Sequence, residues 1–288
     1  MSLRSIDRLS SADVSHGSDL RRLGYRVLER FLDEEAVRST SRGVDAALDG
    51  PAMLGCQRPN NRLAALRWDH PVVRVVLDDR DRMAGLKRAA EARDLRWISA
   101  YVSSKEPFSP PLPWHQDWWC WDHPISFQPA AAQLALLCYL GPTDSNNGAL
   151  RLLPSSHRQS TPLHRELYDA RAAASPEGDY PLLCEKLGQV TLSLNPGDAV
   201  LLDYRLLHGT HANESSERRD CVLLSFAPSW SALPAELKAH LIQHPALPSE
   251  GEQATARSSF MAPVLPQFDG CRADLPLNVT GPAEFTTH

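Results

Sequence analysis

Short apolar segments separated by Pro, Gly, Asn and Ser residues fill the chain from Trp97 to about residue 228. Residues 133–140 are apolar almost without interruption, as expected of a strand that is buried on both faces. The expected strands lie at residues 97–104, 133–140, 149–153, 190–194, 199–202 and 221–226. Many short strands at this spacing are typical of a β sandwich or barrel. The pattern predicts a mainly β fold with flanking helices, in the form of a double-stranded β-helix (a cupin-like jelly roll) that encloses a small-molecule site.

The segment that precedes these strands combines one short strand with two helical regions. Residues 24–28 are expected to form the strand. Asp33 can then cap a helix through its carboxylate, and Glu34 and Glu35 favour the positive end of the helix dipole. Residues 70–94 form the second helical region, whose expected buried side chains are Val72, Val73, Val76, Leu77, Met83 and Leu86. We expect both helical regions to cover a sheet rather than to form the centre of the core.

At 288 residues the chain can form one large domain, and we expect a single domain over residues 1–288. Its jelly-roll core is expected at about residues 97–228, between an N-terminal helical flank and a C-terminal tail. The 30 basic and 35 acidic residues give a net charge of −5, which predicts no nucleic-acid partner. No secretory signal, stretch of membrane-spanning length or C-x-x-C pair is recognisable. We therefore expect a cytoplasmic protein with reduced thiols and no membrane partner, whereas the oligomeric state stays open.

A candidate metal site begins with His115 and Asp117, two residues apart at the end of an apolar run. Residues i and i+2 of an extended chain point to the same side, so both side chains can bind one metal ion. His208 closes a later strand-like run and can supply a second imidazole. Two histidines and one carboxylate on one face of a metal ion leave the opposite positions open, which suits a non-haem Fe(II) oxygenase.

His164 and Glu166 form the competing pair, because they make the only His-x-Glu in the chain. They stand at the front of a segment whose composition favours a helix. On a helix, residues i and i+2 face apart, so this pair is the poorer chelator. We therefore predict the metal site at His115, Asp117 and His208.

Four short motifs follow one another between residues 114 and 215. They are Trp114-His115-Gln116-Asp117, the run from Asn147 to His157, Pro196-Gly197-Asp198, and the run from Asp203 to Gly209 followed by Asn213-Glu214-Ser215. Together these motifs resemble the phytanoyl-CoA dioxygenase family of Fe(II)- and 2-oxoglutarate-dependent oxygenases. The resemblance implies a jelly roll that uses Fe(II), 2-oxoglutarate as co-substrate and O2.

The resemblance also implies residues that bind the co-substrate. The family places an arginine eleven residues past the second histidine, which here is Arg219, to bind the distal carboxylate of 2-oxoglutarate. A guanidinium matches a carboxylate with two parallel hydrogen bonds, whereas Arg218 would point the other way on a strand. Thr210 resembles the hydroxyl position that helps to hold the same carboxylate. The family pattern of a short apolar run followed by His and Gly selects His208 over His211 as the ligand.

Aromatic side chains near the ligand pair are candidates for the pocket wall. Trp118 and Trp121 are the predicted substrate contacts, because ligand pockets are lined by apolar and aromatic groups. Part of this tryptophan cluster is expected to pack in the core instead. Tyr101 offers a hydroxyl for cofactor binding if the side of the strand that it shares with Ser99 and Ser103 faces the barrel interior.

The sequence thus predicts a dioxygenase that hydroxylates a small-molecule metabolite, of secondary-metabolite or lipid-like type, with release of succinate and CO2. Asp117 favours an oxygenase outcome, because the related halogenases carry a small residue in place of this carboxylate. The alternatives are a catalytically silent jelly-roll binding protein and a cupin-type metal-dependent isomerase or hydrolase. Arg219 distinguishes them, since neither alternative needs a buried cation near the metal. The substrate, desaturation or ring formation as outcomes, and the role of residues 229–288 stay open.

Overall fold

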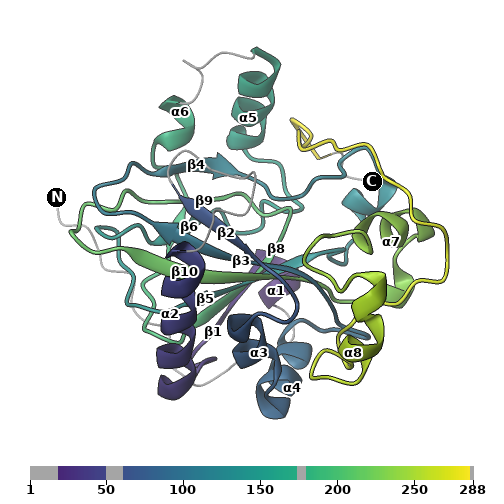
Figure 1. The fold of residues 1–288 in the computed structure, drawn as a ribbon. Helices are drawn as coiled ribbons and strands as arrows, with labels where there is room; N and C mark the ends of the chain where they lie inside the picture. Colours follow the sequence, from purple (N-terminus) through teal and green to yellow (C-terminus); the bar gives the residue numbers. More distant parts are fainter. Residues whose placement is uncertain (1–18, 50–60, 174–179, 286–288) are drawn as a thin grey trace.

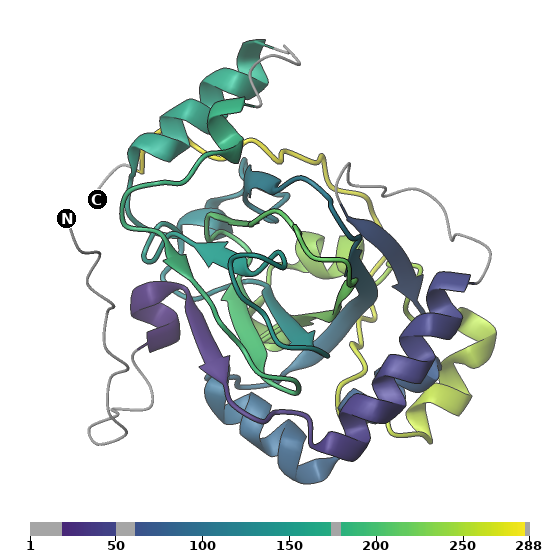
Figure 2. The same ribbon diagram turned by 90° about the vertical axis from the view of Figure 1, so that its left-hand side faces the viewer.

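Two antiparallel sheets form the centre of the protein in the computed structural model, which describes residues 19–49, 61–173 and 180–285 (Figures 1 and 2). Within these ranges the larger sheet has the strand order β1-β8-β5-β10-β3-β2 and the smaller one β4-β9-β6-β7. The strands of the larger sheet are β1 (Tyr25–Leu28), β2 (Arg62–Leu66), β3 (Arg96–Lys105), β5 (Leu134–Tyr139), β8 (Ala199–Asp203) and β10 (Arg219–Ala227). Those of the smaller sheet are β4 (Leu112–His115), β6 (Leu150–Leu152), β7 (Val190–Thr191) and β9 (His208–Thr210). The arrangement confirms the predicted mainly β jelly-roll class.

The larger sheet is buried on both faces. Val222 and Leu224 of β10 pack outward into one core, together with helices α2 (Glu34–Asp49), α3 (Pro71–Leu77) and α4 (Arg80–Ala89). These helices lie below the sheet in Figure 1. Cys221 and Leu223 point the other way, into a second core between the two sheets. Tyr101 of β3 is the register partner of Leu223, so Tyr101 faces the barrel interior together with Ser99 and Ser103.

The N-terminal helices follow the signals in the sequence. The backbone N–H of Ala36 donates to Asp33 Oδ1 at 2.8 Å, so Asp33 caps α2 as predicted. All six apolar side chains predicted to be buried in residues 70–94 are buried. This region divides into two helices because α3 ends at Asp78, and Asp79 then adopts an extended conformation and caps α4 through its side chain.

The remaining helices cover the small sheet and the barrel ends. Helices α5 (Pro162–Ala173) and α6 (Tyr180–Leu183) lie over β4 at the top of Figure 1. The tail forms α7 (Ala235–Leu241) and α8 (Gln253–Arg257), and α1 (Asp19–Leu23) precedes β1. The described residues also form the 3-10 turns η1 (Pro124–Phe127), η3 (Trp230–Ala232) and η4 (Glu250–Glu252). Leu237 and Leu241 of α7 pack into the core between the sheets.

Two strands of the larger sheet lie outside the predicted 97–228 core. β1 pairs with β8, and β2 pairs with β3 at the sheet edge. The sequence predicts the strand at residues 24–28, whereas β2 was not expected. The division of the chain into a core and flanks stays a prediction. Among the described residues, no helix is long and apolar enough to cross a membrane, and Cys120, Cys138, Cys184, Cys221 and Cys271 are free thiols.

A buried ion pair fixes the connection between β8 and β9. The Nε and Nη2 atoms of Arg205 donate to the two carboxylate oxygens of Asp203 at 3.0 and 2.7 Å, and both side chains are almost inaccessible to solvent. Arg205 Nη1 donates to the carbonyls of Ser126 and Gln128. Burial alone would raise the pKa of Asp203, but the Arg205 guanidinium holds this pKa below its ordinary value. The pair therefore attaches the β8–β9 connection to the turn around η1.

We expect Arg205→Leu to lower the free energy of unfolding by about 3 to 5 kcal/mol, because it leaves the Asp203 carboxylate buried without its partner. The double variant Asp203→Leu, Arg205→Leu is expected to regain much of this loss. Arg165→Leu is a matched control, since Arg165 pairs with Glu284 at the surface and such pairs contribute at most about 1 kcal/mol. Urea denaturation measures all three, and equal losses for Arg165→Leu and Arg205→Leu would contradict the expectation.

His164 makes the stability of the protein sensitive to acid. Its side chain is 1% exposed, and burial lowers its pKa from 6.5 to about 4. Between these two pH values the unfolded chain binds a proton that the folded chain does not, so stability falls as the pH drops from about 6.5 to about 4. We expect His164→Gln to reduce this fall by about 2 to 3 kcal/mol. Urea denaturation of both proteins at pH 7 and pH 4.5 measures the difference, and parallel losses would count against it.

Candidate metal centre and active site

Strands β4 and β9 place the two predicted histidine ligands opposite each other. His115 is the last residue of β4 and His208 the first of β9, and they are register partners in the small sheet. Asp117 lies two residues past the end of β4. The backbone N–H groups of Asp117 and Trp118 both donate to the Tyr204 carbonyl at 2.9 Å, so the β8–β9 connection also fixes the carboxylate ligand.

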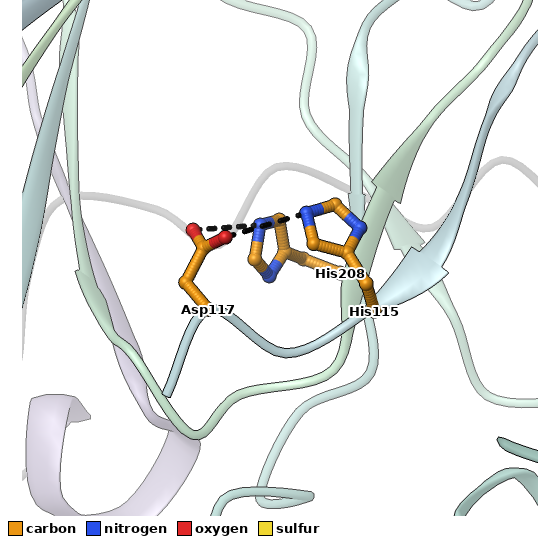
Figure 3. Close-up of side chains that lie close together, drawn as sticks. All are labelled: His115, Asp117 and His208. Carbon is orange, nitrogen blue, oxygen red and sulfur yellow. Dashed lines mark ion pairs between the residues drawn. The ribbon is translucent and has the colours of Figure 1, made fainter. Parts of the chain in front are cut away.

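The three side chains converge on one point, as Figure 3 shows. His115 Nε2 lies 3.6 Å from Asp117 Oδ1, and His208 Nε2 lies 3.4 Å from Asp117 Oδ2. An ion about 2.1 Å from each donor atom can bridge separations of up to roughly 4 Å, so the group fits a metal ion. In the part of the chain that the structure describes, no other three His, Cys, Asp or Glu side chains gather in this way. His164 therefore does not take part in such a group.

Backbone carbonyls set the proton positions of both imidazoles. His115 Nδ1 lies 2.8 Å from the Pro113 carbonyl, and His208 Nδ1 lies 3.0 Å from the Leu206 carbonyl. A carbonyl only accepts hydrogen bonds, so Nδ1 carries the hydrogen in each ring and Nε2 presents its lone pair. These contacts orient both rings toward the Asp117 carboxylate, which is how metal-binding histidines are normally held.

Arg219 starts β10 on the interior side of the large sheet. Its side chain is 5% exposed, and its Nε and Nη2 atoms are buried without a hydrogen-bond partner among the described residues. Arg218 behaves differently, because its guanidinium forms ion pairs with Asp220 and Asp45 near the surface. The structure thus separates the two arginines as the sequence predicts. A buried guanidinium with unused donors fits the carboxylate of an anionic co-substrate.

A second buried cation, Lys105, lies beside Arg219. The two residues are register partners on β3 and β10, and the Lys105 side chain is completely buried. Lys105 Nζ donates to the Pro110 carbonyl at 2.6 Å. Burial, with added repulsion from Arg219 and Arg151, lowers the pKa of Lys105 to about 7. Thr210 lies on β9 two residues past His208, and its Oγ1 accepts the Leu112 N–H at 3.2 Å.

The predicted pocket residues lie deeper than expected. Trp118 and Trp121 are 1% and 3% exposed and belong to the core between the sheets. The Trp118 indole N–H donates to Ser126 Oγ, and Trp121 packs near Phe127. Their role as substrate contacts stays a prediction. Trp119 is half-buried, and its indole N–H donates to Gln133 Oε1.

Tyr101 and His211 each contact a side chain that sequence reasoning did not pair with them. Tyr101 Oη lies 3.1 Å from His244 Nε2, so the tail reaches the barrel interior. His211 Nε2 lies 2.8 Å from Thr191 Oγ1 and is outside the metal group, which agrees with the choice of His208. The role of Tyr101 in cofactor binding stays a prediction.

Sequence reasoning missed Lys105 and Tyr139 in the barrel interior. Lys105 continues the spacing of Ser99, Tyr101 and Ser103 by two residues, so the same alternation could have placed it on the inner face. Tyr139 offered no such signal, because β5 is apolar on both faces and its sequence does not alternate.

Comparisons with known proteins identify the family of the chain. The family model for phytanoyl-CoA dioxygenase (PhyH) matches residues 20–221. A probable alpha-ketoglutarate-dependent hypophosphite dioxygenase of Stutzerimonas stutzeri is 27% identical over 158 residues, which are 53% of this chain and 53% of that enzyme. The ectoine dioxygenase of Nocardia farcinica is 24% identical over 226 residues, 73% of this chain and 76% of that enzyme.

Among solved structures, HygX from Streptomyces hygroscopicus, crystallised with nickel and 2-oxoglutarate, shares the fold. Its TM-score is 0.56 at 20% sequence identity, over 75% of this chain and 88% of HygX. The match of the family model over residues 20–221 confirms the family that the four motifs predict. The chain therefore belongs to the phytanoyl-CoA dioxygenase family.

Proposed function

We propose that this protein hydroxylates a small-molecule metabolite, converting substrate, 2-oxoglutarate and O2 into the alcohol, succinate and CO2. One observation carries the proposal. The convergent His115, Asp117 and His208 side chains share a barrel with the buried, unpaired guanidinium of Arg219. Bound iron supplies the oxidative decarboxylation of 2-oxoglutarate and the transfer of an oxygen atom to a C–H bond.

The protein side chains hold the reactants. His115 and His208 would offer Nε2 lone pairs and Asp117 a carboxylate oxygen to the iron, and three protein ligands suit an ion that must also take up 2-oxoglutarate and O2. Arg219 holds the distal carboxylate of 2-oxoglutarate by two charge-assisted hydrogen bonds. Thr210 supports the same carboxylate, and Lys105 adds positive charge beside it.

The relatives support a small-molecule substrate. Two of them are named for hypophosphite and ectoine, and neither name refers to a macromolecule. A catalytically silent binding protein, or a cupin-type isomerase or hydrolase, has no need for Arg219 in this position. Incubation of the iron-loaded protein with 2-oxoglutarate and a metabolite panel tests the proposal. We expect succinate release, together with a product heavier by one oxygen atom, and a protein that binds iron but no 2-oxoglutarate would overturn it.

The metal ligands generate the first prediction on function. His115→Ala, Asp117→Ala and His208→Ala should each weaken Mn(II) or Fe(II) binding by more than about a hundredfold, since loss of an outer partner alone typically costs about 10- to 100-fold. His211→Ala is the matched control and should keep the affinity of the unmodified protein. Calorimetric titration with Mn(II) measures the affinities. Loss of binding in His211→Ala with retention in His208→Ala would move the third ligand to His211.

Arg219 generates a prediction on the co-substrate. Arg219→Ala should raise the apparent 2-oxoglutarate requirement roughly tenfold to a hundredfold, because a hydrogen bond to a charged group contributes about 1.5 to 3 kcal/mol. Arg218→Ala should change it less than about twofold, since Arg218 pairs with Asp220 and Asp45 instead. Succinate formation as a function of 2-oxoglutarate concentration measures both. Equal effects of the two substitutions would contradict the placement of Arg219 inside the barrel and of Arg218 near the surface.

A further inference from the structure

Tyr139 is the last residue of β5, and its hydroxyl group is buried without a partner. The residue is completely inaccessible to solvent, and no described group forms a hydrogen bond with its Oη atom. A buried polar group without a hydrogen-bond partner destabilises the folded state. Phenylalanine would fill the same core position without this cost, so packing alone does not explain a tyrosine here.

The Tyr139 ring lies beside the Arg219 guanidinium. Tyr139 is the register partner of Cys221 on β10, and Arg219 is two residues from Cys221, on the same face of the strand. The Cζ atom of Arg219 lies 5.5 Å from the centre of the Tyr139 ring. Burial raises the pKa of Tyr139, so its hydroxyl stays protonated and can donate a hydrogen bond.

Three unused donor groups are therefore buried in the same region of the barrel: Arg219 Nε, Arg219 Nη2 and Tyr139 Oη. No carboxylate of the described residues neutralises Arg219, whose register partner is Lys105. A carboxylate accepts about four hydrogen bonds through its two oxygens. One carboxylate of a ligand can thus use all three donors, whereas a neutral ligand would leave the charge of Arg219 unbalanced.

We propose that the Tyr139 hydroxyl binds the distal carboxylate of 2-oxoglutarate beside Arg219. This inference rests on the proposed function, since it assigns a further contact to the same co-substrate. Arg219 supplies the charge, and Tyr139 supplies a third, uncharged donor. The pocket then selects a 2-oxo acid by its distal carboxylate as well as by the groups that bind the metal.

Calorimetry on the Mn(II)-loaded protein tests the inference without turnover. The probes are 2-oxoglutarate and 2-oxopentanoate, which has the same number of carbon atoms but lacks the distal carboxylate. We expect Tyr139→Phe to weaken 2-oxoglutarate binding about tenfold or more, because a hydrogen bond to a charged acceptor is lost. Binding of 2-oxopentanoate should change less than about twofold. Tyr168→Phe removes a hydroxyl at an exposed position on α5 and should change neither.

A role for Tyr139 in packing alone gives a different result. In that case Tyr139→Phe would lower the melting temperature of the ligand-free protein, or would weaken both probes alike, and the inference would be wrong. We expect the ligand-free variant to melt at the same or a higher temperature, since the unpaired hydroxyl is gone. Unchanged 2-oxoglutarate binding in Tyr139→Phe, with a loss in Arg219→Ala, would overturn this inference and leave the proposed function standing. No binding of 2-oxoglutarate by the unmodified Mn(II) protein would overturn both.

Discussion

The active site depends on one cross-strand pair, His115 opposite His208. The strands β4 and β9 that carry them are short, and their register is irregular between Leu112 and His115. Successive side chains of a strand point to opposite faces, so a slip by one residue would turn one imidazole out of the barrel. The carbonyls of Pro113 and Leu206 hold the two rings, each from two residues before the histidine that it contacts. The register of β4 with β9 and the orientation of the two imidazole rings thus both depend on these two short segments.

The Tyr204 carbonyl holds the backbone at Asp117, the third residue of the candidate metal site. It accepts hydrogen bonds from the backbone of Asp117 and Trp118, and its neighbour Arg205 is held by the Asp203 carboxylate. The side-chain amide of Gln116 donates to the Arg205 carbonyl, which adds a further contact between the two ligand-bearing segments. Because the ion pair is buried, it holds the β8–β9 connection in one conformation. The geometry of the metal site therefore depends on a charged pair outside the barrel as well as on the sheet.

Much of this arrangement could be predicted from the sequence, because the relevant signals are local. The apolar run at 133–140 and the Asp33 cap each specify their own structure. That His115 and Asp117 can point to the same side follows from their spacing on an extended chain. The surroundings of Arg219 could not be predicted in this way. Its neighbours Lys105 and Tyr139 come from strands distant in sequence, and only the register of the large sheet brings them together. The burial of Trp118 and Trp121 could not be predicted for the same reason, since it depends on the segments that cover them.

The tail lies outside the family match and contacts a residue of the barrel interior. The family model ends at residue 221, whereas His244 follows α7 and reaches Tyr101 in the barrel interior. His244 Nδ1 accepts the Ala246 N–H, and burial lowers the pKa of His244 to about 4, so the neutral ring carries its hydrogen on Nε2. His244 then donates to Tyr101 Oη, and the hydroxyl hydrogen of Tyr101 is directed at an acceptor other than His244. Tyr101 is four residues from Lys105, or about 13 Å along the strand. The tail thus orients the Tyr101 hydroxyl in the barrel interior, well apart from Arg219 and Lys105.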